Sequence, residues 1–483
     1  MQFASSLRII GILLVIFSLL HLPPILVSLW YNDHEFTAFG QAFCLTLATG
    51  AAIWLVFYNQ RRELRVRDGF FIVVVLWTVL SLFGALPFIL SINQDISLID
   101  SFFESVSGLT TTGSTVLVGL DEFPKSILYY RAQLQFIGGM GIIILAVALL
   151  PIFGIGGLQL YRAEITGPVK DNKLTPRIKE TARVLWLVYV GLNIACIISY
   201  WWAGMSFFDS VCFAFATIST GGYAPYDMNI GQYPEARFLI VAIFFMLLGG
   251  INFALHFSVF RNFDPKIYWK DTETREFIII IMVIVMICWA SLSYLQNEHP
   301  VYDNLLRSLF TVVSIITTSG FTIEDLTFWP LFLAILVFFA GLVGSCSGST
   351  SGGMKIIRAI LMLRQGGRQI KKAIHPNGIF PLKLGKIAIP ENIADAVWGF
   401  VCIYISLVLI VFLILLATGL DLITALSATF TSIANIGAGL GAIGVDAKGI
   451  NDTAKIVMSL GMLVGRLEIF TVLVLFTPAF WRG

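Results

Sequence analysis

Residues 110–114 read TTTGS, and three similar short turns occur later in the chain, at 219–223 (STGGY), 317–321 (TTSGF) and 434–438 (ANIGA). Each turn lies at the end of an apolar stretch that is too short to cross a bilayer. These stretches are 99–112, 207–221, 305–319 and 423–436. Such short stretches are typical of re-entrant segments. Their irregular ends are tolerated at membrane depth only inside protein or along a water-filled cavity. We therefore expect four re-entrant segments that carry polar turns.

The rest of the chain has the composition of a polytopic membrane protein. Of its 483 residues, 57% are hydrophobic and 12% charged, whereas a soluble domain has about 25% charged residues. The mean hydropathy is +0.87. Ten further apolar stretches are long enough to cross the bilayer: 8–30, 38–58, 69–92, 126–152, 183–204, 235–261, 275–296, 329–363, 391–418 and 454–480. The net charge of +2 gives no reason to expect nucleic acid as a partner.

The charged loops orient these spans. Lys and Arg concentrate in the loops 59–68, 162–179, 261–275 and 364–386, whereas the intervening loops carry mainly acidic residues. Basic loops face the cytoplasm, so the four short segments enter from the outside. With ten spans, both termini are expected in the cytoplasm.

After the first two helices, the order spanning helix, short helix, polar turn, spanning helix occurs four times in the same direction. Repeats in one direction indicate an axis along the membrane normal. The predicted fold is an all-α integral membrane protein with four parallel membrane-pore-membrane repeats around a pseudo-fourfold pore, preceded by two extra transmembrane helices. We assign two N-terminal helices to 1–68 and the pore repeats to 69–160, 161–270, 271–385 and 386–483.

A short sequence match supports the repetition. SFFESV at 101–106 recurs as SFFDSV at 206–211, but the turn glycine follows four residues later in the second copy. This difference predicts that the two repeats differ by about one turn in the loop.

The four turns have the chemistry of a cation site. Short helices that enter from outside direct the negative ends of their dipoles toward the membrane centre. Rings of carbonyl oxygens can replace the hydration shell of an ion, and glycine permits the left-handed backbone that this requires. The candidate ligands, mainly through backbone carbonyls, are Thr111, Thr112, Gly113, Thr220, Gly221, Gly222, Thr318, Ser319, Gly320, Asn435, Ile436 and Gly437. The turns contain no carboxylate, which favours a monovalent cation over calcium.

Two alternatives apply here. Gly and Thr also serve close packing in membrane helices. Packing alone explains a single turn of this kind more readily than four turns at matching positions. The acidic residues Asp121, Glu122, Asp227, Glu324 and Asp325 either attract cations to the mouth or are solvated loop residues; the second interpretation is favoured.

The eighth long stretch contains GLVGSCSGSTSGG at 341–353, with five Gly and five Ser or Thr. This composition predicts a broken helix buried in protein. Because the break lies on the cytoplasmic side of the turns, we interpret it as a mobile gate. The candidate gate residues in it are Gly344, Ser345, Gly348, Ser349, Gly352 and Gly353. A phosphate-binding loop is disfavoured because the GK[ST] pattern is missing.

Arg466 lies inside the last apolar stretch, where a charge costs about 2.5–3.5 kcal/mol and so faces the protein interior. We expect it to donate hydrogen bonds to carbonyls of the 341–351 loop. The alternative is an ion pair with Glu468 or with a neighbouring helix.

These turns, the glycine-serine loop, GGMG at 138–141 and GRLEIFTVLVLFTPAFWR at 465–482 resemble the bacterial Trk-type potassium uptake proteins of the Trk/Ktr/HKT superfamily. The resemblance covers essentially the whole chain. It implies a homodimer in the bacterial inner membrane with one pore per subunit, K⁺ as the transported ion, no organic cofactor, and regulation by a cytosolic nucleotide-binding ring (TrkA-like). In related plant transporters, Ser in place of the first filter Gly is associated with Na⁺ permeation, whereas all four glycines are present here. Ser114, Asn435 and Ile436 depart from the commoner residues of the turns.

The basic cytoplasmic residues have two interpretations. They either dock a regulatory partner, as the resemblance implies, or act as topology signals and contacts to anionic lipid, which is favoured for each residue separately. The residues concerned are Arg162, Lys170, Lys173, Arg177, Arg364, Arg368, Lys371 and Lys372.

The expected function is inward K⁺ conduction, and the alternative is K⁺/Na⁺ or K⁺/H⁺ symport on the same scaffold. An enzyme is not expected, because the apolar stretches carry no HExxH, paired Asp or Ser/His grouping. The six cysteines and five histidines are scattered and do not predict a metal site.

Overall fold

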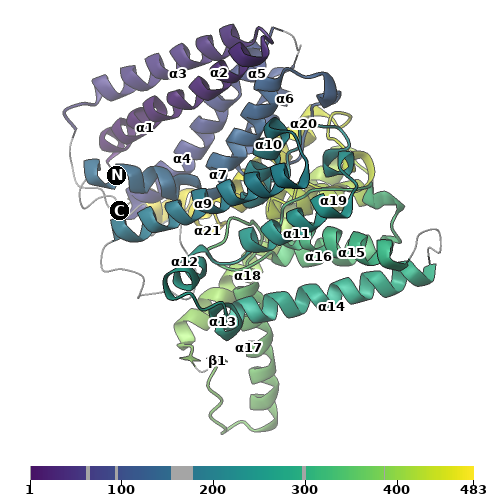
Figure 1. Cartoon of the computed structure of the whole chain (residues 1–483). Coiled ribbons are helices and arrows are strands. Elements are labelled where there is room, and N and C mark those ends of the chain that lie inside the picture. Colours follow the sequence, from purple (N-terminus) through teal and green to yellow (C-terminus); the bar gives the residue numbers. More distant parts are fainter. Residues whose placement is uncertain are drawn as a thin grey trace.

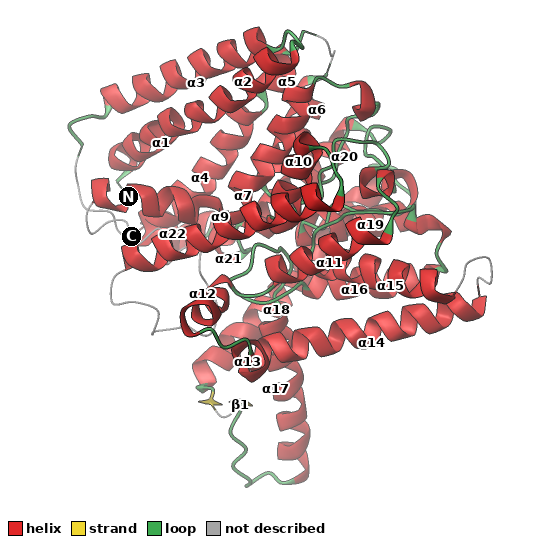
Figure 2. Ribbon diagram, in the orientation of Figure 1, coloured by secondary structure: helices red, strands yellow, loops and turns green. Residues whose placement is uncertain are grey.

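The computed structural model describes residues 2–60, 66–92, 96–153, 178–295, 301–385 and 387–482. Helices make up most of these residues, as Figure 2 shows in red. Two short strands, β1 (Lys383–Leu384) and β2 (Ile387–Ala388), pair antiparallel beside a helix that projects from the rest of the molecule, α17 (Ile356–Ile374) (Figure 1). The all-α membrane fold predicted from the sequence is confirmed.

Two helical spans precede the repeats. The first is continuous from Phe3 to Tyr31 and consists of α1 (Phe3–Ser18), the 3-10 turn η1 (Leu19–His21) and α2 (Leu22–Tyr31). The second, α3 (Phe36–Val56), lies beside α1 (Figure 1). A Cβ on Gly11 or Gly50 would lie 3.0 Å from the carbonyl oxygen of the other. Such contact through small residues is typical of membrane helix pairs.

The remaining helices form four successive sets with the same order. The first set is α4 (Val66–Gly84), α5 (Leu86–Leu90), α6 (Leu98–Leu109) and α7 (Lys125–Phe153). The second is α9 (Ile178–Ala203), α10 (Phe207–Ile218), α11 (Ala236–Gly250) and α12 (Phe253–Asn262). The third is α13 (Lys266–Lys270), α14 (Thr272–Leu295), α15 (Val301–Ile316), α16 (Leu331–Val343) and α17. The fourth is α18 (Glu391–Ala417), α19 (Leu422–Ala434), α20 (Asp452–Arg466), α21 (Phe470–Leu473), η7 (Val474–Phe476) and α22 (Pro478–Arg482).

A 3-10 turn follows the polar turn in each set. These elements are η2 (Leu120–Glu122), η4 (Asn229–Gln232), η5 (Leu326–Phe328) and η6 (Gly441–Ile443). Each set therefore repeats its short helix, its polar turn and its return to a longer helix in the same order.

Three of the short helices begin at the same distance from the turn glycine. Ser97, Ser206 and Asp421 are the N-caps of α6, α10 and α19, and each side chain accepts a hydrogen bond from the backbone N–H three residues later. Each cap lies sixteen residues before its turn glycine. The one-turn loop difference predicted from SFFESV and SFFDSV is therefore wrong. The two strings match out of register, since Asp209 is equivalent to Asp100.

Two apolar stretches that the hydropathy predicted as single spans, 235–261 and 454–480, are sharply bent. Within the described residues, six helices are long and apolar enough to cross a membrane, or up to eight spans if each bent pair counts as one. The bend between α11 and α12 is 101°, and the bend between α20 and the α21–η7 segment is 103°. At the first bend, Asn252 caps α12 by accepting from Ala254 N at 2.8 Å. At the second, Glu468 has a left-handed φ of 51°.

Two buried apolar clusters flank the polar turns. One contains Phe103, Met458 and the N-terminal helices, and the other contains Phe213, Phe310 and Val337. The first cluster thus joins the first and fourth sets to α17, whereas the second joins the second and third sets to α19.

Candidate ion pathway

The four polar turns share one backbone conformation. Their second residues are left-handed, with φ of 52°, 54°, 56° and 54° at Thr111, Thr220, Thr318 and Asn435. The glycines two positions later have φ of 86°, 77°, 71° and 89° at Gly113, Gly222, Gly320 and Gly437. A left-handed β-branched residue is strained, and such strain is common at functional sites. The turns are therefore structural equivalents, as their sequences predicted. We call them filter turns 1 to 4.

The filter turns close into a ring. A Cβ on Gly113 would lie 1.9 Å from the carbonyl oxygen of Gly221, the middle residue of the next turn. The same relation recurs around the ring, at 2.0 Å from Gly222 to Ser319, 1.9 Å from Gly320 to Ile436 and 2.1 Å from Gly437 to Thr112. Because the fourth contact returns to the first turn, the four sets surround one axis. The contacts leave no room for a side chain at the four glycines.

The short helices end at this ring. α6, α10 and α15 each end two residues before the left-handed threonine of their turn, and α19 ends directly before Asn435. The partial negative charge of a helix C-terminus favours a cation. All twelve candidate ligands thus lie in one ring of four turns.

Hydroxyl groups hold three of the turns from behind. Ser107 Oγ donates to the Ser114 carbonyl at 2.6 Å, and Ser314 Oγ donates to the Phe321 carbonyl at 2.7 Å. Thr431 Oγ1 donates in the same way to the carbonyl of Ala438. Each hydroxyl belongs to the residue six positions before the turn glycine. It therefore ties the end of its short helix to the residue that follows the glycine.

Asn435 gives the fourth turn a different side-chain role. Its Nδ2 donates to Thr112 Oγ1 at 2.9 Å and to the Met462 carbonyl at 3.0 Å. Asparagine tolerates the left-handed conformation better than threonine does. The departure from Thr thus adds a direct link between the fourth and first turns.

A cavity of about 370 Å³ lies against the ring, and all four filter glycines line it together with residues that follow them. Asp227, Glu324, Asp325 and Asp446 also line this vestibule. All four carboxylates hold protein groups. Asp227 accepts from Gly119 N and Leu120 N, Glu324 pairs with Arg307, and Asp446 accepts from Lys448 N.

The remaining acidic candidates differ from one another. Asp325 Oδ1 accepts from Thr327 N at 2.8 Å, whereas Asp121 and Glu122 are exposed. The solvated interpretation thus fits Asp121 and Glu122, whereas Asp227, Glu324 and Asp325 shape the mouth through hydrogen bonds.

The loop after filter turn 2 is tied to its short helix by tyrosines. Tyr226 and Tyr233 donate to Asp209 Oδ2 at 3.1 and 2.7 Å. Burial, followed by the nearby carboxylate, raises the pKa of both hydroxyls. Both tyrosines therefore stay protonated donors at neutral pH.

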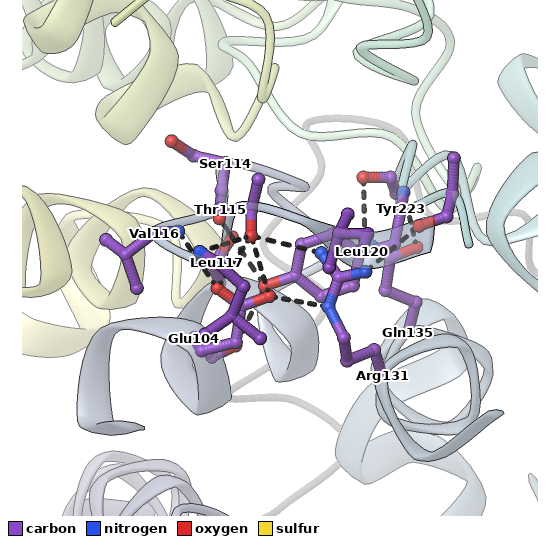
Figure 3. A network of polar contacts seen from close by, with 12 residues as sticks. Glu104, Ser114, Thr115, Val116, Leu117, Leu120, Arg131, Gln135 and Tyr223 are labelled. Atoms are coloured by element: carbon purple, nitrogen blue, oxygen red, sulfur yellow. Dashed lines mark hydrogen bonds and ion pairs between the residues drawn. The ribbon is translucent and has the colours of Figure 1, made fainter. Parts of the chain in front are cut away.

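A buried ion pair, which the sequence analysis missed, braces filter turns 1 and 2 (Figure 3). Arg131 Nε donates to Glu104 Oε1 at 2.7 Å, and both side chains are at most 1% exposed. Arg131 also donates to the Ala224 carbonyl at 2.9 Å, and its guanidinium lies 4.2 Å from the ring centroid of Tyr223. Tyr223 donates in turn to the Glu104 carbonyl at 2.9 Å. The available signal was two charged residues in apolar segments, which by default mark a functional site.

The predicted break follows α16, and the loop lies under the filter turns. Thr350 Oγ1 donates to the Ile218 carbonyl at the end of α10 at 2.8 Å, and Gly352 N donates to Thr318 Oγ1 at 2.7 Å. A Cβ on Gly352 would lie 2.1 Å from the Ala434 carbonyl. The loop thus contacts the second, third and fourth sets at once.

The same loop explains the bend of α11. Cys346 N donates to the Gly250 carbonyl at 3.1 Å, and Thr350 N donates to the Gly249 carbonyl at 3.3 Å. These carbonyls end α11 and would otherwise lack partners within the helix. A loop far along the sequence therefore replaces the next helical turn.

The other gate candidates hold the loop's own shape. Ser345 and Ser349 each pair with the hydroxyl of Ser351. Gly344 and Gly353 pack against each other, since a Cβ on Gly353 would lie 2.9 Å from Gly344 Cα, and Gly348 faces Asn252. Lys355, which the sequence analysis did not single out, donates to the Ser351 carbonyl.

Arg466 contacts the loop as predicted. Its Nη1 donates to the Thr350 carbonyl at 2.9 Å, while Nη2 donates to the carbonyls of Gly138 at 2.5 Å and Gly139 at 3.1 Å. Both glycines belong to the GGMG sequence of α7. The arginine therefore bridges the loop and the middle of α7.

Glu468, the alternative partner considered for Arg466, pairs with a different arginine. Arg358 Nη2 donates to Glu468 Oε2 at 2.7 Å, and the Arg358 guanidinium lies 3.9 Å from the ring centroid of Phe400. This pair joins the start of α17 to the bend after α20.

Two of the basic candidates for partner docking form ion pairs with other helices of the chain. Arg364 lies 3.7 Å from Glu276, and Arg368 lies 2.5 Å from Glu391. Arg162, Lys170, Lys173 and Arg177 lie outside the described residues.

Comparisons with known proteins agree along the whole chain. A family model for cation transport proteins, TrkH, matches residues 35–482. The Trk system potassium uptake protein TrkH of Vibrio parahaemolyticus serotype O3:K6 (strain RIMD 2210633) is 48% identical over 485 residues, with 100% of both chains covered. The protein of the same name from Escherichia coli (strain K12) is 46% identical over 486 residues, again with 100% of both covered. The crystal structure of the potassium transporter TrkH from Vibrio parahaemolyticus matches with a TM-score of 0.91 at 45% identity, covering 100% of both chains. The chain therefore belongs to the TrkH family of cation transport proteins.

Proposed function

We propose that this chain is the potassium-translocating subunit of a bacterial uptake system and conducts K⁺ inward through the four filter turns. The observation that carries the proposal is the cyclic packing of each filter glycine against the middle carbonyl of the next turn. Oxygen ligands held by a rigid backbone can replace the hydration shell of a cation. Potassium as the ion is supported by the relatives, which are named Trk system potassium uptake proteins.

The driving force for uptake need not come from a second ion. An inside-negative potential of about 150 mV supplies about 3.5 kcal/mol per cation, enough for a few hundredfold accumulation. The four filter turns contain no Asp, Glu, His, Lys or Cys that would serve a proton relay. The proposed role is transport and not catalysis, with K⁺ as cargo and no organic cofactor.

The proposed gate is the loop between α16 and α17 together with Arg466. The loop touches three of the four sets below the ring, and Arg466 donates a hydrogen bond to its Thr350 carbonyl. Opening must break these contacts. We expect the movement to involve α17, which continues from the loop.

The proposed setting is the bacterial inner membrane, with both termini in the cytoplasm. The proposed assembly is a homodimer regulated by a cytosolic nucleotide-binding ring of the TrkA type. The words "Trk system" in the names of the relatives support a multicomponent assembly. The division into 1–68 and the repeats 69–160, 161–270, 271–385 and 386–483 is part of the same proposal.

The test is ion flux into proteoliposomes with K⁺, Rb⁺ and Na⁺, comparing the wild type with Gly113→Ser. Gly113 has a φ of 86°, and its Cβ would lie 1.9 Å from the Gly221 carbonyl. The variant should therefore lose discrimination between K⁺ and Na⁺. Gly419→Ser is the matched control, since Gly419 has a φ of 94° and nothing lies within 4 Å of its Cβ. A wild type without K⁺ preference, or equal losses in both variants, would contradict the proposal.

Conduction and symport are separated by a second measurement. In a planar bilayer, conduction predicts a reversal potential that follows the K⁺ gradient alone. A shift of that potential with an imposed pH or Na⁺ gradient supports K⁺/H⁺ or K⁺/Na⁺ symport instead.

A further inference from the structure

Filter turn 2 lacks the hydroxyl that holds the other three turns. The position six residues before its glycine is Ala216, where the other sets have Ser107, Ser314 and Thr431. Alanine has no group that can donate to the backbone. Yet the backbone of filter turn 2 matches the others, with φ of 54° at Thr220 and 77° at Gly222. A different group must therefore hold this turn.

Gln135 of α7 fills that role in the structure. Its Nε2 donates to the Gly221 carbonyl at 2.7 Å, and its Oε1 accepts from Tyr223 N at 3.1 Å. The side chain is 0% exposed, so the two bonds are made away from water. This orientation of the amide satisfies both partners. The flipped orientation would place the amide NH₂ against the Tyr223 N–H, so that two donors would face each other. One side chain thus bonds the residues on both sides of Gly222.

The approach of Gln135 also explains an odd residue in the filter. The middle position is Thr112, Ser319 or Ile436 in the other turns, but Gly221 in the second. A Cβ on Gly221 would lie 2.5 Å from Gln135 Cδ, which is closer than non-bonded carbons can approach. Gln135 can therefore take this position only because residue 221 is glycine.

The hydrogen bond from Gln135 involves a carbonyl that is part of the ring. The carbonyl that Gln135 holds is the one against which Gly113 packs, since a Cβ on Gly113 would lie 1.9 Å from it. Losing the amide therefore affects the contact between filter turns 1 and 2. An unbonded buried Tyr223 N–H would add a desolvation cost.

We propose that Gln135 is a positioning residue for filter turn 2 that replaces the hydroxyl missing at Ala216, and that discrimination between K⁺ and Na⁺ depends on it. The proposal rests on the proposed function of the ring as a K⁺ filter. Gln135 acts through Gly221 and Tyr223. The expected readout is therefore selectivity, with some flux retained.

The experiment measures K⁺ and Na⁺ flux in proteoliposomes for Gln135→Leu and Gln135→Met, which keep similar volume without the amide. We expect the K⁺/Na⁺ flux ratio to fall about tenfold, since losing a buried hydrogen bond costs 1–3 kcal/mol and 1.4 kcal/mol is tenfold. The second variant serves if the first does not fold. Gln133→Leu is the matched control, because Gln133 is buried on the same helix but donates to Leu20, outside the ring.

A rescue variant distinguishes positioning from mere stability. Adding Ala216→Ser to Gln135→Leu supplies the hydroxyl that the other sets have, and the K⁺/Na⁺ ratio should partly recover. An unchanged ratio in Gln135→Leu, an equal fall in Gln133→Leu, or no recovery in the double variant overturns the proposal. If the wild type itself does not prefer K⁺, the proposed filter function fails instead, so the two failures are distinguishable.

Discussion

Filter turns 2 and 3 have nearly the same backbone but different supports. Their left-handed residues differ by only a few degrees, with φ of 54° and 77° in turn 2 and 56° and 71° in turn 3. Turn 3 is held by Ser314 of its own short helix, whereas turn 2 is held by Gln135 of α7. The comparison teaches that the ring constrains the backbone, and that different side chains can meet this constraint.

The supports also differ in burial, which sets their expected strength. The brace of turns 1 and 2 is the Glu104–Arg131 pair, whose side chains are at most 1% exposed. Its counterpart near turn 3, Arg307–Glu324, is 18% and 24% exposed. Water can partly replace a missing partner only in the second pair.

The largest effect is expected from Glu104→Ala. It leaves Arg131 buried without its carboxylate, which costs about 3–5 kcal/mol when a buried pair is broken. Glu324→Ala is the comparison, because more exposed pairs contribute about 0–1 kcal/mol. Thermal unfolding of both purified variants in detergent checks the difference. Equal shifts of the unfolding midpoint would contradict the distinction between the two braces.

A smaller effect is expected from Ser314→Ala, which removes the hydroxyl of turn 3 and so imitates turn 2 without its glutamine. A net hydrogen bond contributes about 1 kcal/mol, so the K⁺/Na⁺ flux ratio should fall about fivefold. Ser199→Ala is the control, since Ser199 bonds the Ala195 carbonyl of its own helix, away from the ring. A ratio that stays at the wild-type value would show that turn 3 needs no support from behind.

The backbone of the ring could be predicted from sequence because glycine reports it directly. Four turn glycines in matching places predicted left-handed backbone, and all four have it, whereas the left-handed residue two positions before each glycine was not predicted. The broken helix and the contact of Arg466 with the loop were predictable for similar reasons, since glycine-rich sequence and a buried charge are strong local signals. The backbone at the turn glycines, the broken helix and the Arg466 contact were therefore predictable from residues that are close together in the sequence.

The supports could not be predicted, because their partners are distant in the sequence. Gln135 and Gly221 are 86 residues apart, and no periodicity links them. The bend of α11 was missed because hydropathy is continuous across it, while its cause is the 346–350 loop that bonds Gly249 and Gly250. The predicted alignment of SFFESV with SFFDSV was wrong because it followed the matching residue types. The equivalent positions are the helix-capping residues Ser97 and Ser206.

The smallest effect is expected at the caps, where the fourth set again differs from the first two. Asp421 caps α19, whereas Ser97 and Ser206 cap α6 and α10. Hydrogen bonds from the Thr424 side chain and backbone hold the pKa of Asp421 below its usual value of 3.8. A lowered pKa means that ionised Asp421 stabilises the fold above pH 4, and that this contribution is lost as the pH falls through the lowered pKa.

Asp421→Ser should make the cap of the fourth set insensitive to pH, like those of the first two. Serine and aspartate cap helices about equally well, so the unfolding midpoint at pH 7 should be nearly unchanged. Below pH 4 the wild type should lose slightly more stability than the variant, and thermal unfolding between pH 3 and 7 measures the difference. Asp421→Ala is the control, because losing the cap costs about 1 kcal/mol at neutral pH. If Asp421→Ser lost as much stability at pH 7 as Asp421→Ala, the charge of Asp421 and not its capping bond would be what the fourth set needs. The three caps at matching positions would then not be interchangeable, in contrast to the supports of the ring.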